Sequence, residues 1–226
     1  TVTGGELTEW LVLEKVWSPY HLSDNLIIPH GQTMSVYDGV ELHISEAITI
    51  EVNGILNIGS ATLSSVGSGA RWGGLIIGDN VETEALLLGT HLVEGTPLIT
   101  MDGQSKITIS NAIIARSSST EPLIQTTINS AGQITIINSE LSDSGAECVS
   151  TQGAAIVTMF ETSLESCGDV DLWMRGTQID LTNVSLEGGA DLAFVTGTMS
   201  NIVSTGDIEV SNIDGLSIEN LDLVGT

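Results

Sequence analysis

Residues 107–114 read ITISNAII, and five later segments repeat this arrangement of apolar and polar residues. In most copies the first, third and eighth positions are apolar and the fifth is asparagine. The later copies are ITIINSEL (134–141), VTMFETSL (157–164), IDLTNVSL (179–186), GTMSNIVS (197–204) and LSIENLDL (216–223). Because apolar and polar residues alternate at the start of each copy, the repeat predicts β-strands.

The fifth positions of successive copies lie 27, 23, 22, 18 and 19 residues apart. Periods in the twenties are typical of solenoid proteins. Leucine-rich repeats share this length, but the chain lacks their fixed leucine pattern and their helical half. The variable spacing favours a β-helix, in which one loop can lengthen without disturbing the stack. We therefore predict an all-β chain, a right-handed parallel β-helix of about nine coils.

Asparagine at the fifth position has a structural explanation. It tolerates the left-handed conformation that a tight corner between two strands requires, and stacked amides can form a hydrogen-bonded ladder along the axis. The ladder residues are Asn111, Asn138, Asn183, Asn201 and Asn220. Glu161 replaces asparagine in the third copy, and we expect its corner to point outward or to be irregular. Asn183 also begins the glycosylation sequon Asn183-Val184-Ser185. Ligand contact is the alternative role for these residues.

The first half of the chain alternates short apolar strands with glycine turns and then reads RWGGLII at 71–77. Over about residues 17–78 this order resembles the first coils of secreted right-handed parallel β-helix proteins of the pectate-lyase-like superfamily. The residues that carry the resemblance are Pro29, Gly31, Gly39, Val52, Asn53, Gly54, Leu56, Trp72, Gly73 and Gly74. The resemblance implies an extracellular or cell-surface location and a non-enzymatic surface or adhesion role.

Two segments are expected along the chain. Residues 1–25 are interpreted as an N-terminal cap, because ELTEWLVLEKVW (6–17) suits a helical turn or a strand and an open stack needs a cover. Residues 26–226 are predicted to form one β-helix domain. Since the repeat continues to the last residues, we expect further chain or another molecule to cover the last coil.

The charge of the chain excludes some partners. It has 29 acidic and 5 basic residues and a net charge of -24. Phosphate contacts need Lys and Arg, so no binding of nucleic acid is expected, and anionic lipid is disfavoured for the same reason. No membrane insertion is expected, because the chain has no apolar run of the roughly 18 residues that a spanning helix needs.

No catalytic residue is assigned, and the sequence favours a non-enzymatic protein. The resemblance implies that a lyase of this fold would place Lys or Arg beside calcium-binding carboxylates. Lys106 and Arg116 flank one strand–turn–strand unit, but no lyase motif surrounds them. The paired aspartates, Gly-His-Gly turn and Arg-x-Lys of the related glycosidases are missing. The histidines have no metal-ligand spacing.

Two small groups remain as candidate sites. Asp169, Asp191 and Asp207 follow the fifth repeat position by six to eight residues and could stack at one corner. Stacked like charges repel, and a bound Ca²⁺ would reverse that effect, so calcium is the one cofactor considered. Cys148 and Cys167 are 19 residues apart, close to one coil. They could form a disulfide or stay as two buried thiols.

The sequence favours a structural or adhesive β-helix module that associates with itself or with further domains of the same chain. The alternatives are a polysaccharide-active enzyme, either a lyase or a glycoside hydrolase, and a non-catalytic glycan-binding module. Exposed aromatic residues in a groove would favour glycan binding. The candidates are Trp173, Phe160, Phe194, Tyr37 and Tyr20. Phe160 and Trp173 lie in apolar strands, so we expect both in the core.

Overall fold

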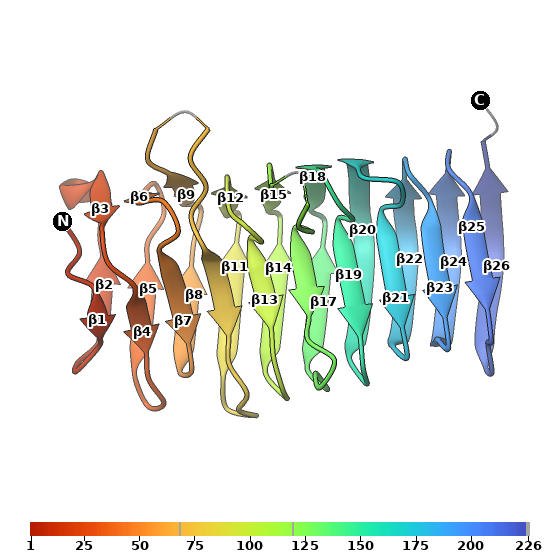
Figure 1. Cartoon of the computed structure of the whole chain (residues 1–226), viewed down its shortest axis with the longest axis horizontal. Coiled ribbons are helices and arrows are strands. Elements are labelled where there is room, and N and C mark those ends of the chain that lie inside the picture. Colours follow the sequence, from red (N-terminus) through yellow and green to blue (C-terminus); the bar gives the residue numbers. More distant parts are fainter. Residues whose placement is uncertain (68, 119, 225–226) are drawn as a thin grey trace.

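The computed structural model describes residues 1–67, 69–118 and 120–224. Its strands stack as about ten parallel turns along one axis, with the two termini at opposite ends (Figure 1). The all-β parallel solenoid predicted from the repeat is confirmed. A single 3-10 turn, η1 (Lys15–Trp17), is the only helix of the described residues, so none is long enough to cross a membrane. Gly225 and Thr226, the last residues of the predicted 26–226 domain, lie outside the described part.

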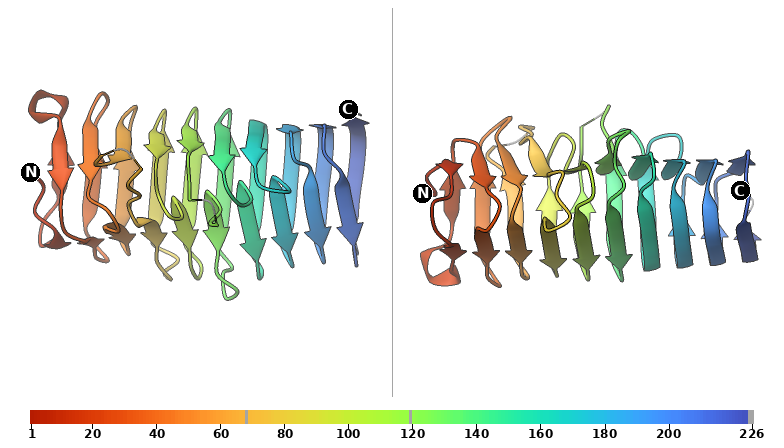
Figure 2. Two further views of the ribbon diagram at one scale, coloured as in Figure 1. Left: turned by 45° about the horizontal axis from the view of Figure 1, so that its top comes forward. Right: turned by 90° about the horizontal axis from the view of Figure 1, so that it is seen from below.

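Each turn of the first two thirds of the chain contributes one short strand to each of three faces, and Figure 2 shows this path from two further sides. The first face is a ten-stranded sheet of β1 (Gly5–Glu6), β4 (Leu26–Ile28), β7 (Thr49–Val52), β10 (Gly74–Ile77), β13 (Ile99–Met101), β16 (Ile124–Thr126), β19 (Val149–Gln152), β21 (Leu172–Arg175), β23 (Ala190–Ala193) and β25 (Ile208–Ser211). The second face begins with β2 (Leu11–Leu13), β5 (Thr33–Val36), β8 (Ile55–Ile58), β11 (Glu84–Leu88), β14 (Lys106–Ser110) and β17 (Gln133–Ile137). The third begins with β3 (Tyr20–Leu22), β6 (Glu41–Ile44), β9 (Thr62–Ser65), β12 (His91–Val93), β15 (Ile113–Ala115) and β18 (Glu140–Ser144).

The second and third faces merge toward the C-terminal end. Four long strands run across both faces: β20 (Ile156–Cys167), β22 (Gln178–Leu186), β24 (Thr196–Ser204) and β26 (Leu216–Leu223). Each bends at the fifth position of the repeat, where a residue of positive φ turns the chain without ending the strand. The spacing shortens to 18 and 19 residues because the loops at the other corners shorten: residues 116–123 separate β15 from β16, whereas only 187–189 separate β22 from β23.

The core consists of rows of aliphatic side chains that point inward, one from each turn. In β5, for example, Met34 and Val36 are buried while Thr33 and Ser35 are more exposed, because successive side chains of a strand point to opposite sides. One row passes through the second face in register: Leu13, Val36, Ile58, Leu87, Ile109, Ile136, Met159, Leu181, Met199 and Ile218. All of these side chains are buried except that of Ile218.

Residues 1–25, which we interpret from the sequence as a cap, are built as a turn of the solenoid. Strands β1, β2 and β3 pair in parallel with β4, β5 and β6. Val2 crosses the outer edge of this turn and forms a parallel bridge with Leu22, which is fully buried. Its strands therefore form the first of about ten turns.

Candidate functional site

A groove of about 730 Å³, the N-terminal groove, opens between η1 and strands β5, β8 and β11 of the second face. Val16 of η1 and Leu86 and Leu88 of β11 form apolar walls. Tyr37 follows β5 at the corner and also lines the groove, and the residue is 54% exposed. The backbone N–H of Tyr37 donates to the carbonyl of Leu13 at 3.0 Å, so strand pairing fixes the backbone from which the ring projects.

Polar groups stand beside the apolar walls of the N-terminal groove. Asp38 and Asn57 line it, and Asp38 Oδ1 accepts a 2.8 Å hydrogen bond from the backbone N–H of Ser60 on the next turn. The Lys15 side chain packs over Gly39, whose φ of 73° suits glycine at this tight corner. Apolar walls with a few fixed polar groups and an aromatic ring are the usual composition of a site for a small ligand.

The aromatic residues differ in part from the expectation. Phe160 is exposed and Trp173 is half-buried on the outside of the first face, so the prediction that both stack in the core is wrong. In the apolar runs that contain them, the neighbours Met159 and Met174 take the inward positions. The guanidinium of Arg175 lies 5.0 Å from the centre of the Trp173 ring, a cation–π distance.

The remaining aromatic residues lie mainly toward the N-terminal end. Trp72 is fully buried and donates from Nε1 to the carbonyl of Val93 at 2.9 Å. Trp10 and Trp17 are both largely exposed on the first turn. Tyr37 is the aromatic residue that lines the N-terminal groove, and Phe194 is exposed in the second half of the chain.

The fifth repeat positions form one exposed corner, which we call the asparagine corner. All six residues have φ between 47° and 55°, in the left-handed region. Amide hydrogen bonds join Asn138 to Asn111 at 2.6 Å, Asn201 to Asn183 at 3.0 Å and Asn220 to Asn201 at 2.9 Å. The ladder therefore runs along the outside of the molecule.

Glu161 interrupts this ladder between Asn138 and Asn183. It keeps the same backbone conformation, with φ of 49°, and its side chain is exposed. The corner thus points outward, one of the two outcomes expected for it. A polar groove of about 520 Å³ follows the corner and is lined by Glu161, Glu140 and three of the asparagines. Asn183 of the sequon is exposed in this groove.

The three aspartates considered for calcium lie near one another. Asp169, Asp191 and Asp207 line one pocket of about 530 Å³ together with Glu209. Asp191 also forms an ion pair with Arg175 at 2.7 Å. The three carboxylates are not within 4.8 Å of one another, which is the separation at which side chains can share one ion.

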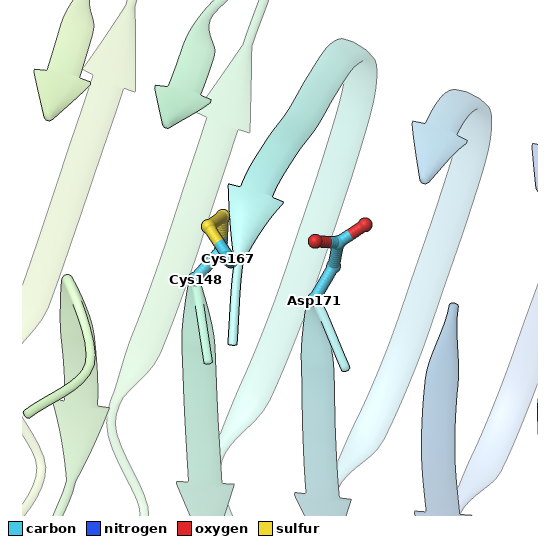
Figure 3. A group of neighbouring side chains, drawn as sticks. All are labelled: Cys148, Cys167 and Asp171. Atoms are coloured by element: carbon cyan, nitrogen blue, oxygen red, sulfur yellow. A yellow bond between two sulfur atoms is a disulfide. The ribbon is translucent and has the colours of Figure 1, made fainter. Parts of the chain in front are cut away.

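A disulfide joins Cys148 and Cys167, whose Cα atoms are 5.3 Å apart on neighbouring turns. The carboxyl group of Asp171 lies beside it (Figure 3), and all three side chains are buried. We call these residues the disulfide corner. Burial raises the pKa of Asp171 to about 6, although hydrogen bonds from backbone N–H groups, chiefly that of Gly188, oppose the shift. The bond from Gly188 to Asp171 Oδ2 is 2.7 Å long.

Asp171 is missing from the candidates found in the sequence. Asp169 and Asp171 stand two residues apart in the same polar stretch, and only the turn geometry decides that Asp169 is exposed and Asp171 buried. Its place directly before the apolar strand Leu172–Arg175 gives no signal, because Leu172 and Met174 face inward and alternation would place residue 171 outward. The turn after Cys167 brings Asp171 inward instead.

The basic residues considered for lyase chemistry occupy different faces. Lys106 begins β14 on the second face, whereas Arg116 follows β15 on the third face and forms an ion pair with Glu94 at 3.6 Å. Across residues 1–67, 69–118 and 120–224, the one group of three potential metal ligands within 4.8 Å is Cys148, Cys167 and Asp171.

Comparison of the chain with protein-family models, with curated proteins and with solved structures finds no match.

Proposed function

We propose that the chain is a structural or adhesive module of a secreted or cell-surface protein. In this proposal it is a right-handed β-helix of the pectate-lyase-like kind that associates with a second copy or with further domains of the same chain. The observation that carries the proposal is the unbroken stack of about ten parallel turns, whose sheets run the length of the described residues. Strand β26 adds an exposed apolar surface of Ile218, Leu221 and Leu223 to this stack.

Further turns of the same chain and a second copy are both chemically suitable partners for the edge of β26 that does not face β24. Glu219 and Asp222 stand on the same strand, and each copy has a net charge of -24. Copies therefore repel at low ionic strength, and we expect association to strengthen as salt screens these charges.

Light scattering and negative-stain microscopy over a range of protein and salt concentrations test this proposal. We expect dimers or rods whose mass rises with salt, and Leu221→Glu should abolish them. Ile55→Glu is the matched control, because it adds the same charge to a similarly exposed strand residue near the other end. A monomer at every concentration and salt level, or equal effects of both variants, would remove self-association.

A second candidate function is non-catalytic glycan binding at the N-terminal groove. The exposed ring of Tyr37 beside apolar walls and polar groups is the observation that favours it. Neutral glycans fit better than acidic ones, given the charge of -24. We expect Tyr37→Ala to abolish binding to a panel of neutral oligosaccharides and Phe194→Ala, exposed elsewhere, to preserve it. Release of shortened products in the same panel would favour the alternative of a polysaccharide-active enzyme.

Calcium binding by Asp169, Asp191 and Asp207 is a further proposal for the structural module. It is supported by the common pocket of these carboxylates, because a hard cation would offset their mutual repulsion. Since the three carboxylates are not all within 4.8 Å of one another, the pocket would have to contract, or water molecules would have to complete the coordination of the ion. Thermal unfolding with calcium and with chelator tests it. An unchanged melting temperature would remove calcium from the proposal.

A further inference from the structure

Three side chains of different polarity meet inside the disulfide corner. Cys148 precedes β19, Cys167 ends β20 and Asp171 precedes β21, so two successive turns supply the group. One ligand atom from each residue lies within 4.8 Å of the other two. Cys148 and Asp171 are fully buried and Cys167 is nearly so. Figure 3 shows the carboxyl group and the disulfide on neighbouring turns.

The carboxyl group of Asp171 is only half satisfied. Oδ2 accepts the hydrogen bond from Gly188, whereas the buried Oδ1 has no hydrogen-bond partner among the described residues. An unsatisfied buried oxygen of a carboxyl group is costly. Such a group in a folded protein calls for a specific explanation, and a bound ion is one.

We propose that reduction of the Cys148–Cys167 disulfide converts the disulfide corner into a metal site formed by two thiolates and the Asp171 carboxylate. Two thiolates and one carboxylate favour Zn²⁺ or a similar borderline-soft ion, and a water molecule would take the fourth position of a tetrahedral site. Disulfide sulfurs are weak ligands, so the metal form requires the reduced state. The same two turns would then be joined by a covalent bond in one state and by a metal in the other.

A dithiol can serve as the reductant of the Cys148–Cys167 disulfide. The dithiol supplies two electrons and two protons, its own sulfurs form a disulfide, and the Cys148–Cys167 bond breaks to give two thiols. Zn²⁺ then displaces the two thiol protons and forms two zinc–sulfur bonds, and the Asp171 carboxylate supplies the third ligand. An oxidising compartment favours the disulfide form and a reducing one the metal form.

An ion and a reductant have a route to this corner. A surface pocket of about 450 Å³ is lined by Cys167, Gly188 and Glu187. It brings solvent to the side of Cys167, and Gly188 is the residue whose N–H group contacts Asp171. The metal would therefore not need the core rows to open.

Titration of the dithiol-reduced protein with Zn²⁺, and with Co²⁺ as a spectroscopic probe, tests the proposal. We expect one ion per chain, a thiolate-to-cobalt charge-transfer band and no tight binding before reduction. Loss of an outer partner of a metal ligand weakens binding by roughly 10–100-fold, so Asp171→Asn should weaken it at least as much. Glu165→Gln, which removes an exposed carboxylate two residues before Cys167, should leave zinc affinity unchanged.

Two further measurements cover the case in which reduction or substitution unfolds the chain. Zinc should raise the melting temperature of the reduced protein, or restore its circular dichroism if reduction unfolds it. The double variant Cys148→Ala, Cys167→Ala should show neither effect. The proposal is overturned if the reduced protein binds no zinc, if zinc neither stabilises nor refolds it, or if Asp171→Asn binds zinc as tightly as the unchanged chain.

Discussion

The first and last turns of the solenoid end the same row of inward side chains in different ways. Leu13 at the N-terminal end is 2% exposed, whereas Ile218 at the other end is 40% exposed. On the first turn, Val2 runs across the edge and covers Leu22. On the last turn Leu223, which continues a neighbouring row, is 57% exposed. Both ends belong to the same row of inward side chains, but among the described residues only the N-terminal end of the row is buried.

This difference teaches that a turn of a solenoid takes its stability from its neighbours. Each turn contacts only the one before and the one after, so interface energies add along the axis. Among the described residues β26 pairs only with β24, so in a protein of this sequence alone β26 should open more readily than the inner strands.

The largest expected effect on the free energy of unfolding comes from replacing an end residue of the inward row by alanine. Leu13→Ala should cost about 2–5 kcal/mol, the range for a large buried side chain replaced by alanine. Ile218→Ala should cost about 1 kcal/mol or less, because its side chain already contacts water. Chemical denaturation at low protein concentration, followed by circular dichroism, measures both.

The concentration dependence of the same pair of variants sharpens the comparison. If the last turn is covered by a second copy in solution, the cost of Ile218→Ala should rise with protein concentration while that of Leu13→Ala stays constant. Equal costs at high dilution would contradict the view that the last turn lacks a cover.

The second expected effect is a pH dependence of stability that arises from the buried Asp171 in the later turns. The pKa of Asp171 is about 6 in the folded chain against an ordinary 3.8, so the folded state holds its proton more tightly than the unfolded state. Stability should therefore be highest below pH 3.8 as far as this group is concerned, fall between pH 3.8 and about 6, and stay constant above. A shift of about two pKa units corresponds to roughly 3 kcal/mol.

Asp171→Asn should remove the fall in stability between pH 3.8 and about 6, whereas Asp169→Asn should preserve that fall. Unfolding free energies measured from pH 3 to pH 8 give the slope for all three chains. If the unchanged chain and Asp171→Asn show the same slope, the buried carboxyl does not control the pH dependence.

The fold could be predicted from the sequence because its signals are periodic. Alternation within the strands and the recurrence of asparagine follow from geometry that each turn repeats. The role of residues 1–25 could not be predicted in the same way. ELTEWLVLEKVW mixes a strand (Leu11–Leu13) with a 3-10 turn, and its short strands have no repeat copy that would identify them.

The site residues were harder to predict because they depend on side-chain direction. In the apolar run IVTMF of β20, Met159 points inward and Phe160 outward, and composition alone does not give that parity. The inward direction of the Asp171 side chain is set by a turn, so the alternation of strand residues does not predict it. The spacing of 19 residues between Cys148 and Cys167 places them on neighbouring turns. Whether they form a disulfide depends on the direction of their Cβ atoms, which the sequence does not give.

The smallest expected effect concerns the one copy of the corner that lacks asparagine. Glu161 has φ of 49°, a conformation that asparagine adopts more easily than glutamate. In Glu161→Asn, the new amide would stand between Asn138 and Asn183 and join the two parts of the ladder. Each new hydrogen bond adds about 0.5–1.5 kcal/mol at most, and less at an exposed corner, so we expect a gain of about 1 kcal/mol in unfolding free energy.

The gain must be separated from the general benefit of removing a negative charge from an acidic chain. Glu165→Asn provides this control, because it removes an exposed glutamate from the same strand at a position without positive φ. Equal stability of the two variants would assign the gain to charge alone. A larger gain for Glu161→Asn would show that the asparagine corner stabilises the merged strands, which have no counterpart in the three-stranded turns nearer the N-terminus.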